Sequence, residues 1–113
     1  MDDGAEVDQA WRAEMLEDIA SGDLSRSTRA LLSLTYNEPD REWVEDLLLD
    51  QLREGNDAQL RSLAVICMGH LGRLHGLVSG RLIIVLKDLL GDPVLGGTAE
   101  DALGDIMHFA WIL

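Results

Sequence analysis

Cysteine and histidine have the most specific chemistry of the residue types in this 113-residue chain, and they are few. Cys67 is the only cysteine, and the histidines are His70, His75 and His108. A thiol nucleophile needs a base beside it, but Cys67 falls on the apolar stripe of an expected helix, where a thiol is inert. His70 and His75 are five residues apart, so they point about 140° apart around a helix, and His108 is distant in the sequence. We therefore expect no catalytic residue and no metal site.

The acidic residues and the glycines give no sign of catalysis either. The 21 aspartates and glutamates are spread too evenly to single out a general acid and a general base. Residues 91–97 are rich in glycine, but they lack the lysine and the preceding strand of a phosphate-binding loop. We expect a protein that is not an enzyme and that binds no cofactor.

The charge of the chain is strongly negative and unevenly distributed. The net charge is −12. Residues 1–57 hold 16 acidic and 5 basic residues, a net charge of −11, whereas residues 58–113 hold 5 acidic and 4 basic residues. Such a field repels nucleic acids and anionic membranes, and it attracts basic partners. The same charge also serves simply to keep a small apolar protein soluble.

Three acidic residues lie four apart in the helix expected over residues 41–54: Glu42, Asp46 and Asp50. Like charges at this spacing repel each other by a few tenths of a kcal/mol per pair. The stripe is either a solvated helix face or an electrostatic contact for a basic partner. The sequence leaves both interpretations open.

Apolar spacing predicts an all-α chain. Asp23, Asp40 and Asp57 stand where helix caps are expected, and Pro39 ends the helix that precedes it. Residues 81–90 are rich in β-branched side chains, but their leucines fit helical spacing, and a lone strand would have nothing to pair with. The chain lacks a long apolar run and its N-terminus is acidic, and both features favour a cytoplasmic location. The expected helices cover residues 5–20, 23–36, 41–54, 57–76, 81–90 and 92–111, the last being firm only from Thr98.

The central segment, residues 57–76, is partly repeated downstream. A shift of 35 residues aligns Asp57 with Asp92, Ala64 with Ala99 and Gly69 with Gly104, and a shift of 34 in the other direction gives a weaker match. A period of this length with one helix pair per unit is typical of an α-solenoid. We predict a single domain over residues 1–113 with about three helix pairs, in units near 5–36, 40–76 and 79–112.

The repeated pattern resembles the second helix of a HEAT repeat. The pattern is Leu60-Arg61-x-x-Ala64-x-x-x-Met68-Gly69-x-Leu71, and the likeness extends over roughly residues 24–110. The Arg61 position becomes Ser27 and Gly96 in the other units, so a ladder of arginines between repeats is absent. The resemblance implies a short right-handed α-solenoid of the armadillo type, in which the second helices line a concave binding face.

Applying the repeat register to that face gives a predicted binding ridge. Trp111 either binds the partner or folds back to cover the last repeat. Whether this ridge or the acidic N-terminal half is the main interface also stays open. The ridge consists of Leu31, Thr35, Val65, Gly69, Arg73, Glu100, Gly104, His108 and Trp111.

A second resemblance carries an expected function. The segment from Trp43-Val44-Glu45 through Cys67-Met68-Gly69-His70 to Glu100-Asp101-Ala102-Leu103 is similar to small bacterial HEAT-like proteins, some of which are immunity proteins for polymorphic or contact-dependent toxins. This implies a monomer, alone or in a heterocomplex, that neutralises a basic toxin such as a nuclease by binding it. The alternative is a scaffold or adaptor subunit that self-associates through its helices.

Overall fold

The computed structural model describes residues 3–113, with side chains from residue 9 onward. The structure is 77% helical and confirms the all-α prediction. Within the described residues the elements are α1 (Asp3–Ile19), α2 (Leu24–Asn37), α3 (Arg41–Glu54), α4 (Ala58–His75), β1 (Leu77–Val78), α5 (Gly80–Leu89), α6 (Gly96–Phe109) and β2 (Trp111–Ile112).

Aspartate caps begin three of the helices, as the sequence predicts. The side chain of Asp23 accepts a hydrogen bond from the backbone N–H of Arg26, and Asp40 accepts one from Trp43. Asp57 accepts two, at 2.8 and 3.0 Å. Each cap satisfies amide groups that have no partner inside the helix. At its other end α4 stops because Gly76 adopts a left-handed conformation with φ of 70°.

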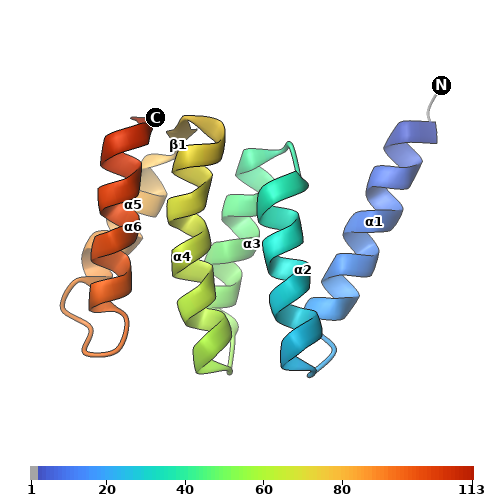
Figure 1. The fold of residues 1–113 in the computed structure, drawn as a ribbon, viewed down its shortest axis with the longest axis horizontal. Coiled ribbons are helices and arrows are strands. Elements are labelled where there is room, and N and C mark those ends of the chain that lie inside the picture. The colour runs from blue at the N-terminus through green and yellow to red at the C-terminus, as the bar shows by residue number, and fades with distance from the viewer. Residues whose placement is uncertain (1–2) are drawn as a thin grey trace.

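Successive helices form three hairpins that stand side by side in chain order (Figure 1). Helix α1 packs on α2, α3 on α4 and α5 on α6, while α4 also packs against both α2 and α6. Helices α2, α4 and α6 therefore form one row, with α3 and α5 behind it in Figure 1. This arrangement places the second helix of every hairpin on the same side of the molecule. The right-handed solenoid and the repeat boundaries remain predictions.

The C-terminal part differs from the sequence prediction. Asp92 accepts hydrogen bonds from the N–H groups of Val94 and Leu95, but this turn precedes α6, which begins only at Gly96. Helix α6 ends at Phe109 rather than near Trp111. Residues 111–112 instead pair in parallel with residues 77–78. The sequence did not reveal these strands because each has two residues and the partner lies more than 30 residues away.

A buried carboxylate connects the hairpin of α3 and α4 to the hairpin of α5 and α6. Glu45 of α3 is fully buried and forms ion pairs with Arg41 and Arg81. It also accepts a hydrogen bond of 3.0 Å from the backbone N–H of Ser79, just before α5. Since Arg81 lies in the first turn of α5, this network fixes that helix against α3.

Apart from Ser27, Thr35 and Glu38, the remaining buried side chains are apolar. Fully buried side chains from α2, α3, α4, α5 and α6 meet between the row of second helices and the helices behind it. No helix within residues 3–113 combines the length and the hydropathy that crossing a membrane requires.

Candidate partner interface

Four residues of the predicted binding ridge lie inside the protein, so this part of the prediction is wrong. Leu31 and Val65 have no exposed surface, Thr35 is 1% exposed, and Gly69 is buried. The prediction treated the central helix as having one apolar and one open side. However, α4 has neighbours on three sides, namely α2, α3 and α6. Only a narrow stripe of its surface reaches solvent.

That exposed stripe is displaced by one residue from the predicted ridge. On α4 it contains Ile66 and His70 in place of Val65 and Gly69, and it keeps Arg73. The repeat register extends the stripe to equivalent positions on α2 and α6, all of which are exposed or half-buried. We call the following set the second-helix face: Leu32, Tyr36, Ile66, His70, Arg73, Asp101, Asp105 and His108.

The spacing of polar residues in α4 could have revealed this stripe. Ser62, His70 and Arg73 lie on the same side of the helix as Ile66. The prediction instead followed small residues, which mark close helix packing. A Cβ atom added to Gly69 would lie 3.1 Å from the Cα atom of Ala102 in α6. Gly69 therefore permits a close helix contact and leaves no room for a partner.

His70 is the centre of the second-helix face. Its ring centroid lies 5.4 Å from that of Tyr36 in α2, and its Nδ1 atom lies 2.7 Å from a guanidinium nitrogen of Arg73. Because arginine can only donate, His70 accepts at Nδ1 and carries its proton on Nε2. Burial, and next the charge of Arg73, lower the pKa of His70, while Asp105 acts in the opposite direction. His70 is thus held as a neutral imidazole between an aromatic ring and a cation.

Two hollows follow the seams of the second-helix face. The first lies between α2 and the start of α4, has a volume of about 410 Å³ and includes Leu24, Leu32 and Gln59 in its lining. The second lies between α4 and α6 and has a volume of about 220 Å³. Its lining is Ile66, His70, Thr98, Asp101, Ala102 and Asp105. Such a surface offers shape, apolar area and charge together, which partner interfaces combine.

The other members of the predicted ridge are exposed but lie toward the C-terminal end. Glu100, Gly104 and His108 are open to solvent on α6. The side chain of Trp111 is 81% exposed. The chain around it folds back, because the backbone N–H of Trp111 donates to the Gly76 carbonyl at 2.9 Å. The backbone therefore covers the end of the molecule, while the indole ring stays available for contact.

The acidic stripe of α3 is partly neutralised within the chain. Asp46 forms an ion pair with Arg81, and Glu42 lies 3.7 Å from a guanidinium nitrogen of Arg41. Asp50 has no ion pair among the described residues. Asp46 and Asp50 line a cleft of about 270 Å³ between α1 and α3, together with Leu16, Trp43 and Leu47. The guanidinium of Arg12 lies 4.3 Å from the centre of the Trp43 ring and covers part of it.

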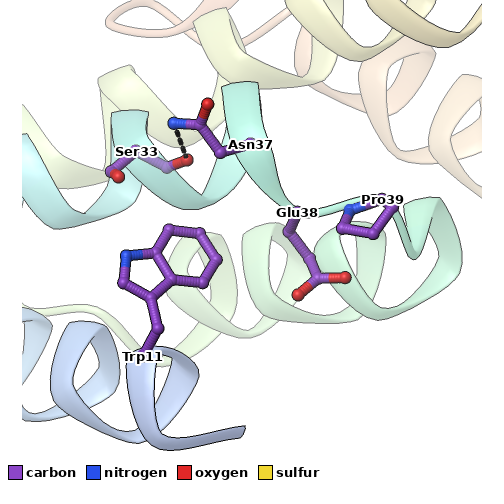
Figure 2. A pocket seen from close by; sticks show the side chains of 5 residues that line it. All are labelled: Trp11, Ser33, Asn37, Glu38 and Pro39. Atoms are coloured by element: carbon purple, nitrogen blue, oxygen red, sulfur yellow. Dashed lines mark hydrogen bonds between the residues drawn. The ribbon is translucent and has the colours of Figure 1, made fainter. Parts of the chain in front are cut away.

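A third hollow, of about 330 Å³, lies between α1 and α2 (Figure 2). The indole of Trp11 points from α1 toward Ser33 and Asn37 of α2, while Glu38 and Pro39 close one side. The carboxylate of Glu38 is already engaged, because Arg12 donates to it at 2.7 Å and the N–H of Asp40 at 2.8 Å. The hydrogen bond from Arg12 lowers the pKa of Glu38. This hollow therefore marks where α1 is anchored.

The residues with reactive chemistry remain apart. Cys67 has no exposed surface, and burial raises the pKa of its thiol to about 11, against the effect of a hydrogen bond with Thr35. Among the described side chains, no three histidine, cysteine, aspartate or glutamate residues come close enough together to hold a metal ion.

No protein-family model and no curated protein matches the chain, so the resemblance to HEAT repeats remains a prediction. The chain is similar to a chain in the crystal structure of a CDI complex from Cupriavidus taiwanensis LMG 19424. The two chains share 38% sequence identity, the match covers 86% of each, and the TM-score is 0.77. Identity at this level over nearly the whole length shows common descent. The protein therefore belongs to the family of that subunit of the Cupriavidus taiwanensis CDI complex.

Proposed function

We propose that this protein is the immunity protein of a contact-dependent inhibition system and that it neutralises a toxin by binding it. The observation that carries the proposal is the 38% identity, over 86% of both chains, to a subunit of a CDI complex. We take such a complex to pair a toxin with the immunity protein that binds it. The toxin has to supply the damaging chemistry, whereas here the single thiol is buried and the open surface is suited to contact.

The second-helix face is the surface that we assign to the toxin. It combines a tyrosine, an arginine and an exposed isoleucine, and tyrosine and arginine are among the residue types enriched at energetic hot spots. Tyr36 is 49% and Ile66 is 42% exposed, so both have apolar surface to bury on binding. The net charge of −12 favours a basic toxin, and a nuclease, which has to attract nucleic acid, fits that description.

Coexpression with the toxin encoded beside this protein tests the function. Cells that produce the toxin should stop growing, and cells that also produce this protein should grow. Calorimetry with the two purified proteins should show a one-to-one complex. The proposal fails if the protein neither binds that toxin nor protects the cells.

A pair of identical substitutions tests the assigned surface. Ile66→Ala changes the second-helix face, while Ile84→Ala changes an isoleucine of α5 that is 64% exposed in the other layer. We expect Ile66→Ala to weaken binding about tenfold, equivalent to about 1.4 kcal/mol, and Ile84→Ala to leave the affinity unchanged. Equal effects of the two substitutions would exclude the second-helix face as the centre of the interface.

A second candidate function is a scaffold subunit that self-associates. The observation in its favour is a group of exposed apolar side chains at the C-terminal end, including Phe109, Trp111 and Leu113, which are 51%, 81% and 69% exposed. Exposed patches of this kind often mark interaction sites. Light scattering of the purified protein separates the two functions, because a monomer that binds the toxin contradicts the scaffold and a stable homo-oligomer without toxin affinity supports it.

A further inference from the structure

The hollow between α4 and α6 has two unlike walls. Ile66 and His70 form the α4 side, and Asp101 and Asp105 stand one turn apart on the α6 side. Between them Ala102 packs tightly against Gly69, which brings the two helices together at the bottom. The result is an apolar recess of about 220 Å³ with two carboxylates at its edge.

Arg73, the cation of the second-helix face, contacts His70 and forms no ion pair with either carboxylate. No hydrogen bond or ion pair reaches the side chain of Asp101 or Asp105 among the described residues. Two negative charges four residues apart on a helix repel each other. A cation placed between them removes that repulsion and gains two charge-assisted hydrogen bonds.

The acidic cleft between α1 and α3 is less suited to bind a cation. Its Asp46 already pairs with Arg81, and Arg12 already covers part of the Trp43 ring. A basic partner could reach Asp50 in this cleft but would have to displace both arginines to use Asp46 and Trp43, so only one carboxylate is open to it. The hollow between α4 and α6 requires no such exchange, so charge complementarity favours it.

We infer that the hollow between α4 and α6 receives one lysine or arginine side chain of the toxin. This inference rests on the proposed function. The aliphatic stem of the incoming residue lies along Ile66, and its charged group reaches the carboxylates of Asp101 and Asp105, which is how long basic side chains bury their stems and keep their charge paired. Tyr36 packs on His70 at the border of the hollow. It contacts the toxin next to the incoming basic side chain.

The experiment removes the two charges while preserving shape. The variant Asp101→Asn/Asp105→Asn is compared with Glu54→Gln/Asp88→Asn, which removes two exposed charges outside the hollow and outside the predicted ridge. Each protein is titrated with the purified toxin by calorimetry at two salt concentrations. We expect the hollow variant to lose at least tenfold in affinity and to show a smaller change of affinity with salt than the wild type, and the control variant to lose less than threefold in affinity.

A double-mutant cycle then identifies the toxin residue. Each exposed lysine and arginine of the toxin is replaced by methionine and tested against wild-type protein and the hollow variant. One toxin residue should show a coupling of at least tenfold, so that its replacement weakens binding to the wild type but not to the hollow variant.

The outcomes separate this inference from the function on which it rests. If wild-type protein fails to bind the toxin, the proposed function is wrong and the inference falls with it. If wild-type protein binds and the hollow variant binds equally well, or if no toxin residue is coupled to the aspartates, only the inference is overturned. Circular dichroism checks that both variants fold, as expected for substitutions at a surface.

Discussion

At the scale of single residues, burial decides which groups can react. Cys67 is the only thiol, has no exposed surface, and has a pKa raised to about 11 by burial. A thiol in this state is almost wholly protonated at neutral pH, and the thiolate is the reactive form. We expect a thiol reagent such as iodoacetamide to leave the folded protein unmodified at pH 7.5 and to add once per chain in denaturant. Mass spectrometry measures both, and rapid labelling of the folded protein would contradict the packing described here.

His70 makes the stability depend on pH in a defined direction. Burial and Arg73 lower its pKa below the ordinary value of 6.5 in the folded protein, with Tyr36 and Asp105 as its other near neighbours. The unfolded chain therefore takes up the proton first. The contribution of neutral His70 to the stability of the folded protein is complete above pH 6.5. This contribution is lost as the pH falls through 6.5 toward the pKa of the folded state.

The variant His70→Gln cannot titrate and so provides the comparison. We expect the unfolding free energy of the wild type, measured in urea, to fall relative to that of His70→Gln between about pH 7.5 and about pH 5. A constant difference between the two proteins across this range would show that His70 has the same pKa in both states.

At the scale of the helices, a buried carboxylate and a close helix contact fix the C-terminal hairpin. Glu45→Gln leaves Arg41 and Arg81 without their shared counter-charge, since Glu45 is fully buried. Breaking one side of a buried ion pair costs about 3–5 kcal/mol. We expect a loss of that size in urea unfolding.

The control for this prediction is Glu42→Gln on the same helix. The side chain of Glu42 is 73% exposed and lies 3.7 Å from Arg41, and an exposed pair of this kind contributes less than about 1 kcal/mol. Equal losses for the two variants would show that the network around Glu45 does not hold α5 in place.

Gly72 in α4 lies at the contact with α6, whereas Gly104 in α6 does not. A Cβ atom at Gly72 would lie 3.0 Å from Cγ1 and 3.2 Å from Cα of Ile106, whereas a Cβ at Gly104 would meet nothing within 4 Å. Gly72→Leu should therefore cost about 1–3 kcal/mol through overpacking. Gly104→Leu should stabilise the protein by roughly 0.5–1 kcal/mol through helix propensity alone. Thermal unfolding measures both, and a gain for Gly72→Leu would refute the close contact.

At the scale of the whole molecule, the charge distribution governs encounter with a partner. The net charge is −12 and nearly all of it belongs to residues 1–57, so charges outside the contact surface, such as those of α3, can steer the toxin. The variant Glu42→Lys/Asp50→Lys alters this field and leaves Asp46 paired with Arg81. We expect several-fold slower association at low salt and an unchanged dissociation rate in stopped-flow measurements. An unchanged association rate would show that these charges serve solubility alone.

The sequence alone was sufficient to predict those features of the fold whose cause is local. The caps at Asp23, Asp40 and Asp57 and the stop at Gly76 depend on hydrogen bonds and backbone conformations within a few residues. The all-α class followed from apolar spacing, and the choice of helix over strand for residues 81–90 was correct. The start of α6 was misplaced because Asp92 caps a turn as well as it caps a helix.

Tertiary structure alone decided which side of each helix is open. Composition and charge determined that this is an acidic, helical chain with its only thiol among apolar residues, because those properties are sums over residue types and local spacing. The exposed side of α4 depends instead on having three neighbouring helices, so Val65 and Gly69 are buried while Ile66 and His70 reach solvent. Bringing Asp105 to His70 also required α6 to pack on α4, a contact between residues 35 positions apart that no local pattern contains.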